Sequence, residues 1–141
     1  MNNAPYAGDL VPPDAWSMLE DSERAVLIDC RTAAEWRFVG VPDLAPIGKQ
    51  VLLVEVQRYP DGAPNANFVE DVKGLGIEAD QPLLFICRSG ARSRNAAMMM
   101  TQAGFGPCYN VAEGFEGDKD GEGHRGRAGG WKLAGLPWRQ E

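Results

Sequence analysis

The residues best suited to chemistry form one short run, in which a cysteine stands close to two arginines and a glycine. The run reads Cys87-Arg88-Ser89-Gly90-Ala91-Arg92-Ser93. Neighbouring positive charge and a helix N-terminus both lower the pKa of a thiol, and so make the nucleophilic thiolate available near neutral pH. Backbone N–H groups that curl around one point can also bind a small anion there. We therefore expect Cys87 to react covalently, and the residues after it to bind an anionic substrate.

This run lies between an expected strand and an expected helix. Residues 83–87 are apolar and predict a buried strand, and residues 93–103 predict a helix that Gly104 ends. Ligands of α/β proteins bind at the carboxyl ends of the strands, which is where the thiol would stand. Gly90 permits the tight turn between the two elements, and we expect Ser93 to cap the helix. A strand-end cysteine more often serves packing alone, but the arginines and the glycine favour the reactive interpretation.

The rest of the chain alternates between apolar runs and segments of helical character. Further strands are predicted at residues 25–29, 51–56 and 108–111. Helices are predicted at residues 13–20, 32–36 and 65–75, with Asp14 and Thr32 as caps of the first two. This alternation predicts an α/β fold, with a parallel sheet and helices on both of its faces.

Length and composition limit the classes of protein to consider. The chain has 141 residues, which fits a single domain over residues 1–141, and 44% of them are apolar. A net charge of -6 disfavours binding to nucleic acid, because phosphate repels it. We see neither a secretory signal nor an apolar run of roughly 18 residues, so we expect a cytoplasmic protein without a membrane span. We also expect a monomer.

The three cysteines are Cys30, Cys87 and Cys108. Their number is odd and their spacing wide, so neither a disulfide framework nor a zinc site is expected. His124 is the only histidine, and we expect it to be exposed and to bind no metal. Cys108 is expected in the core. Cys30 is also most simply a packing residue, although it would be a resolving thiol if it came close to Cys87.

Loop length separates two classes of cysteine enzyme. Cysteine phosphatases need a Cys-x5-Arg loop, in which the arginine closes around the phosphate. Here Arg92 is the fifth residue after Cys87, and the sixth is Ser93. The loop is one residue shorter than a phosphate-binding loop, and we expect it to suit a smaller reacting group, such as the outer sulfur of a thiosulfonate or persulfide. A phosphate- or arsenate-handling enzyme is the less favoured alternative.

Several motifs together resemble the single-domain rhodaneses, over about residues 10 to 139. The active-site run after residues 84–86 is the most specific of them. The others are Val26-Leu-Ile-Asp29-Cys30-Arg31 with Glu35, Ala103-Gly104-Phe105, Tyr109-Asn110-Val111, Glu113-Gly114-Phe115, Gly130-Trp131 and Gly135-Leu136-Pro137.

The resemblance implies a central five-stranded parallel sheet and sulfurtransferase activity. In that mechanism a donor such as thiosulfate or a persulfide gives its outer sulfur to the thiolate, and cyanide or an acceptor thiol removes it. Cys87 would carry the persulfide. The backbone of residues 88–92 would form the anion-binding loop, Ser93 would join it in binding the donor, and Arg88 and Arg92 would supply charge. Apart from the resemblance, Asp29 and Arg31 could act in the chemistry, but we favour a supporting ion pair between them that shapes the edge of the site. No metal or organic cofactor is implied.

Two departures from the family pattern concern the surroundings of the site. The family's Gly-His-x-Pro-Gly-Ala stretch is replaced by residues 40–48, which lack the histidine, so substrate preference is open. Residues 117–130 form a glycine-rich, charged insertion, which we expect to be an exposed loop that covers the site or contacts a partner. An alternative function is a binding or regulatory module without turnover, but such relatives typically lack the cysteine that is present here.

Overall fold

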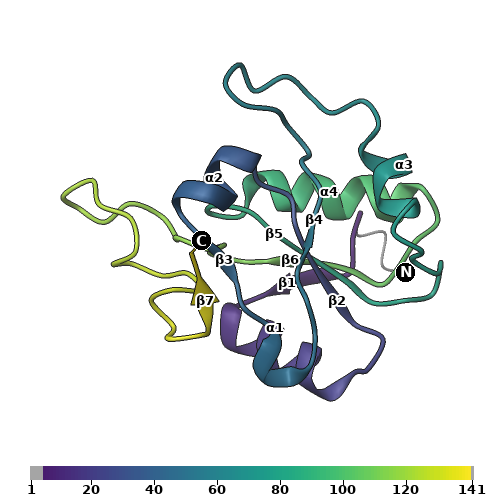
Figure 1. Ribbon diagram of the computed structural model, residues 1–141, viewed down its shortest axis with the longest axis horizontal. Coiled ribbons are helices and arrows are strands. Elements are labelled where there is room, and N and C mark those ends of the chain that lie inside the picture. The colour runs from purple at the N-terminus through teal and green to yellow at the C-terminus, as the bar shows by residue number, and fades with distance from the viewer. Residues whose placement is uncertain (1–4, 141) are drawn as a thin grey trace.

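A five-stranded parallel sheet forms the centre of the computed structural model, which describes residues 5–140 (Figure 1). Its strand order is β1-β6-β5-β2-β4. The strands are β1 (Gly8–Leu10), β2 (Val26–Asp29), β4 (Leu52–Leu53), β5 (Leu83–Ile86) and β6 (Cys108–Val111). A separate antiparallel pair joins β3 (Val41–Pro42) to β7 (Trp138–Arg139). The predicted α/β fold with a five-stranded parallel sheet is confirmed.

Helices cover both faces of the sheet, as predicted. They are α1 (Pro12–Asp21), α2 (Ala33–Phe38), α3 (Phe68–Lys73) and α4 (Ala91–Gln102), with a short 3-10 turn at Ala45–Ile47. Figure 1 shows α1 on one side of the sheet, and α3 and α4 on the other. Alternate residues of each strand belong to two separate hydrophobic cores, because successive side chains point to opposite faces of the sheet. Leu27 and Leu84 pack with α1, whereas Ile28 and Phe85 pack with α3 and α4.

The central strands β2 and β5 end at the same level. Their register pairs Asp29 with Ile86, and the N–H of Cys30 continues the ladder by donating to the carbonyl of Ile86 over 3.0 Å. The residues that follow these strands therefore leave the sheet side by side at its carboxyl edge. This edge is where the sequence places the reactive thiol.

Local signals in the sequence explain the helix that follows β2. The Thr32 hydroxyl accepts the N–H of Glu35, whose carboxylate accepts the N–H of Thr32 in return. This capping box stabilises the start of α2 and confirms the predicted cap. The predicted Asp14 cap is wrong, because the N-cap of α1 is Val11 and Asp14 lies inside the first turn.

The observed boundaries differ from the predicted ones most clearly at one strand and one helix. The strand predicted over residues 51–56 is reduced to β4, and the helix predicted over residues 65–75 is reduced to α3. Strand β1 was not predicted. No helix within residues 5–140 is long and apolar enough to cross a membrane.

Candidate active site

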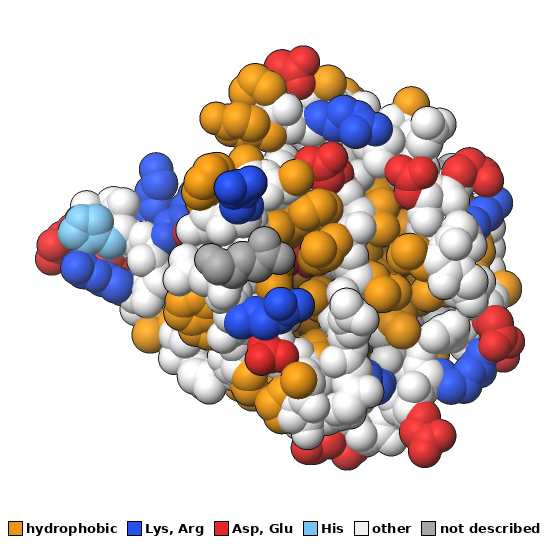
Figure 2. Space-filling view, viewed as in Figure 1, with side chains coloured by type: hydrophobic (Ala, Val, Ile, Leu, Met, Phe, Trp, Pro, Cys, Tyr) orange, Lys and Arg blue, Asp and Glu red, His pale blue; other side chains and the backbone are white. Residues whose placement is uncertain are grey.

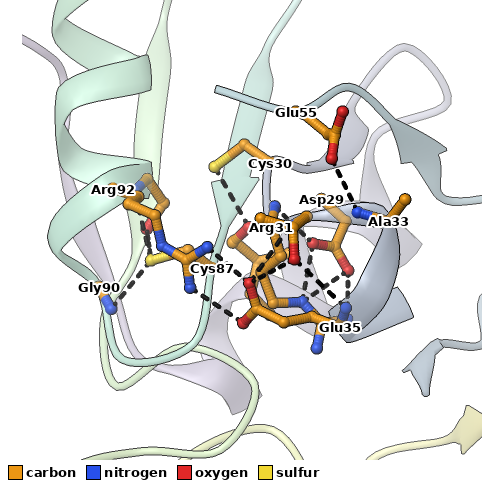
Figure 3. Close-up of polar contacts among 12 residues, drawn as sticks. Asp29, Cys30, Arg31, Ala33, Glu35, Glu55, Cys87, Gly90 and Arg92 are labelled. Atoms are coloured by element: carbon orange, nitrogen blue, oxygen red, sulfur yellow. Dashed lines mark hydrogen bonds and ion pairs between the residues drawn. The ribbon is translucent and has the colours of Figure 1, made fainter. Parts of the chain in front are cut away.

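The sulfur of Cys87 lies in a buried pocket of polar contacts at the N-terminus of α4 (Figure 3). The backbone N–H groups of Gly90 and Ser93 donate to it over 3.2 and 3.3 Å. The Ser93 hydroxyl lies 3.1 Å away. The positive end of the α4 dipole points at the same atom. The two N–H groups and the helix dipole favour negative charge on the sulfur, or on a second sulfur attached to it.

Backbone shape makes this arrangement possible. Gly90 is the N-cap of α4 with φ of 118°, a conformation open to glycine and strained for other residues. The predicted role of Gly90 in the tight turn is therefore confirmed. Ser89 precedes this turn, and Ala91 begins the helix.

The same loop is supported from behind by residues 114–117. The N–H groups of Phe115 and Glu116 donate to the carbonyls of Cys87 and Arg88 over 2.8 and 3.0 Å. A Cβ on Gly114 would lie 2.5 Å from the Arg88 carbonyl oxygen, so only glycine fits there. The sequence motif contained Gly114, but its spacing alone gave no reason to place it behind the thiol.

Ser93 does not cap α4, which corrects the prediction. It lies at the third helical position, and its hydroxyl donates to Oδ1 of Asn110 over 2.6 Å. The amide of Asn110 in turn donates to the carboxylate of Asp9 over 2.9 Å. A chain of hydrogen bonds therefore runs from Cys87 through buried Ser93 and Asn110 to the exposed carboxylate of Asp9. Sequence reasoning gave neither Asn110 nor Asp9 a role.

The two arginines of the loop have different surroundings. Arg92 forms a two-fold ion pair with Glu35 of α2, with N···O distances of 2.7 and 3.0 Å. Burial alone would raise the pKa of Glu35, but the hydrogen bonds and charge of Arg92 outweigh it, and the pKa lies below its usual value. Arg88 is exposed and has no ion-pair partner among the described residues. Arg88 therefore offers the freer charge to an incoming anion.

Asp29 and Arg31 form the buried ion pair that the sequence predicted. Their N···O distance is 2.6 Å, and both side chains are fully buried. Arg31 also donates to the carbonyl of Gly40 and stacks 4.4 Å from the ring centroid of Phe115. The pair thus joins β2 to the segments that support the Cys87 loop. Among the described residues, the Cys87 sulfur is hydrogen-bonded by Gly90 and Ser93 and not by Asp29 or Arg31, which fits the supporting role.

A cavity of about 730 Å³ opens beside the loop. Residues of α2, the 57–62 hairpin and the 116–125 segment line it together with Arg88 and Arg92. Two further arginines, Arg58 and Arg125, bring the total to four, and exposed aromatic side chains come from Phe38 and Tyr59. The carboxylates of Glu35 and Glu116 also line the cavity, so its four arginines outnumber its acidic residues, and the balance favours an anionic molecule.

The 117–130 insertion projects from the body of the protein (Figure 1) and carries both basic and acidic side chains (Figure 2). His124 on it is exposed, as expected. The insertion contributes Arg125 to the cavity, and the Arg125 guanidinium donates to the carbonyl of Gly117 over 2.8 Å. It therefore borders the cavity, whereas the two expected roles, covering the site and contacting a partner, stay predictions. Within residues 5–140, no group of three potential metal ligands is found.

Cys30 and Cys108 are both buried free thiols. Burial, with smaller contributions from the charges of Cys87 and Asp29, raises the pKa of Cys30 well above the usual thiol range. Cys108 lies at the start of β6, and its thiol donates to the carbonyl of Phe105 over 3.5 Å. Cys108 is therefore a core residue at the amino end of the sheet, whereas Cys30 is at the carboxyl end beside Cys87.

Comparison with known proteins agrees with this architecture. Residues 11–120 match the family model for the rhodanese-like domain. The crystal structure of Rv0390 from M. tuberculosis is similar at 52% identity and a TM-score of 0.88, covering 96% of this chain and 99% of that one. The uncharacterized protein RP600 of Rickettsia prowazekii is 36% identical over 89% of this chain and 91% of its own. The thiosulfate sulfurtransferase GlpE of Actinobacillus pleuropneumoniae is 25% identical over 92% of this chain and 90% of its own.

Proposed function

The chain belongs to the rhodanese-like domain family, and on that premise we propose that it is a sulfurtransferase that carries a sulfane sulfur as a persulfide on Cys87. The observation that carries this proposal is the convergence of two backbone N–H groups and the α4 N-terminus on the Cys87 sulfur. Distant relatives named thiosulfate sulfurtransferase add support.

In the first half-reaction, sulfur passes from the donor to Cys87. The Cys87 thiolate attacks the outer sulfur of thiosulfate, a new S–S bond forms, and the old S–S bond breaks to release sulfite. Arg88 stands at the cavity beside the loop, where its charge would attract the donor anion. Arg92 acts with Glu35 as a fixed pair, and it holds α2 against the loop while presenting a part of its charge to the cavity.

In the second half-reaction, sulfur passes from Cys87 to an acceptor. Cyanide or an acceptor thiol attacks the outer sulfur, and Cys87 leaves as thiolate. The N–H groups of Gly90 and Ser93 stabilise this leaving group, because they already donate to the Cys87 sulfur in the resting site. The arginine-lined cavity also favours a persulfide donor that bears carboxylates over a neutral one.

Steady-state turnover tests the proposal. Thiocyanate formation from thiosulfate and cyanide is compared in the wild type, Cys87→Ser and Cys108→Ser. We expect Cys87→Ser to be inactive and Cys108→Ser to match the wild type, because Cys108 lies at the opposite end of the sheet. Full activity in Cys87→Ser would refute the assignment. Inactivity of every variant with thiosulfate and with persulfide donors would favour a binding module.

A further inference from the structure

Cys30 and Cys87 are neighbours across the two central strands. The β2–β5 register pairs Asp29 with Ile86, and the hydrogen bond from Cys30 N–H to the Ile86 carbonyl extends that register by one residue. Cys30 and Cys87 belong to the same core cluster, so their side chains project from the same face of the sheet. In Figure 3 both sulfur atoms lie on the side of the strands that faces α4.

This spacing suits a covalent bond between the two sulfurs. Neighbouring strands lie about 4.7–4.9 Å apart. A disulfide needs Cα atoms about 4.4–6.8 Å apart, so the backbone is already within range. The Cys30 thiol now donates to the carbonyl of Ile86 over 3.4 Å, which is a weak bond for a buried sulfur to give up. Their Cβ atoms must approach to about 3.5–4.5 Å, so rotation of the two side chains together with a small approach of the two strand ends would bring the sulfurs together.

We propose that Cys30 is a resolving thiol that discharges the Cys87 persulfide as hydrogen sulfide. The Cys30 sulfur attacks the inner sulfur of the persulfide, and a Cys30–Cys87 disulfide forms. The bond to the outer sulfur breaks, and that sulfur leaves with the Cys30 proton as hydrogen sulfide. The outer sulfur is reduced and the Cys30 sulfur is oxidised, so no external oxidant is consumed. A dithiol reductant then returns both cysteines to thiols.

Burial makes Cys30 a slow competitor of external acceptors. Its raised pKa keeps it protonated near neutral pH, and the thiolate is the attacking form. The charges of Cys87 and Asp29 also raise this pKa, whereas Arg92 lowers it. An abundant acceptor would therefore take the sulfur first. Without an acceptor, the same site would release sulfide and remain as the Cys30–Cys87 disulfide until a dithiol reduces it. This adds a reductant-dependent, sulfide-releasing activity to the proposed sulfurtransferase.

A chase experiment tests the inference, which rests on the proposed function. Reduced protein is loaded with thiosulfate, desalted, and followed by intact mass and by sulfide release without any acceptor. The persulfide form is about 32 Da heavier than the reduced protein, and the disulfide form is about 2 Da lighter. The wild-type protein should convert from the persulfide form to the disulfide form while it releases sulfide. Cys30→Ala should keep its extra sulfur at least about tenfold longer, because no neighbouring thiol attacks it.

Cys108→Ala is the matched control, because Cys108 is equally buried and also donates to a backbone carbonyl. It should discharge at the wild-type rate. Normal discharge of loaded Cys30→Ala by added cyanide shows that this variant has an intact site. Equal persulfide lifetimes in wild type and Cys30→Ala would overturn the inference while leaving the proposed function standing. Absence of the heavier form in all three proteins, after incubation with thiosulfate and with a persulfide donor alike, would overturn both.

Discussion

Replacement of Gly114 by alanine tests whether residues 114–117 hold the Cys87 loop in place. Gly114 has φ of +64°, and an added Cβ would lie 2.5 and 2.6 Å from the carbonyl oxygens of Arg88 and Cys87. Both obstacles are backbone atoms of the reactive loop, so rotation of a side chain cannot relieve them. The loop or its support must move.

The expected cost follows from two contributions. Left-handed backbone costs about 1–2 kcal/mol for a residue with a Cβ. Overpacking against fixed atoms adds about 1–3 kcal/mol. We therefore expect Gly114→Ala to lower the free energy of unfolding by about 2–5 kcal/mol. Displacement of the N–H groups at Cys87 should also lower kcat/KM about 100-fold in the protein that remains folded.

Gly123→Ala is the matched control. Gly123 has a similar φ of +80°, but nothing lies within 4 Å of an added Cβ. The free energy of unfolding of Gly123→Ala should fall by only about 1–2 kcal/mol, and this variant should keep its activity. Urea unfolding and thiosulfate turnover measure the two effects. The reasoning would be refuted if Gly114→Ala matched Gly123→Ala in both measurements.

Three further perturbations follow from the charges of the site. Glu35→Gln should cost about 1–2 kcal/mol at pH 7 by urea unfolding, because it leaves Arg92 without its partner. The pKa of Glu35 is lower in the folded protein than in the unfolded chain. The stability difference between the wild type and Glu35→Gln should therefore be complete above the ordinary pKa of about 4.3 and shrink as the pH falls below it. A constant stability difference down to about pH 3 would contradict the pairing. Arg88→Ala should raise the KM for thiosulfate about tenfold while exposed Arg94→Ala leaves it unchanged, and equal effects would remove Arg88 from donor binding. Sulfide release from loaded wild type should accelerate between pH 7 and 9, because the raised pKa of Cys30 keeps its thiolate scarce at the lower pH, and a flat profile would argue against thiolate attack.

The parts of the site that could be predicted are continuous in sequence. Strand β5, the loop after it and α4 follow one another without interruption, so an apolar run, a glycine and a helical segment were enough to place Cys87 at a sheet edge. The Thr32 cap was predictable for the same reason, because its partner Glu35 is three residues away. The position of Ser93 was misjudged because the turn at Gly90 starts the helix earlier than the composition suggested.

The parts that could not be predicted depend on residues far apart in the chain. Strand β1 has only one strongly apolar residue and exists because it pairs with β6 about 100 residues later. The same separation hides the bond between Asn110 and Asp9. Cys30 and Cys87 become neighbours only through the β2–β5 register, which no local pattern specifies.

Intact-protein mass spectrometry on a variant with a single thiol tests the central claim most directly. Cys30→Ala and Cys108→Ala together leave Cys87 as the only cysteine, so any bound sulfur has one place to go and no resolving partner. After incubation with thiosulfate and removal of excess donor, we expect a gain of about 32 Da that cyanide reverses. The same variant with Cys87→Ser added should gain nothing. A stable gain without Cys87, or none with it under thiosulfate and persulfide donors alike, would contradict the account.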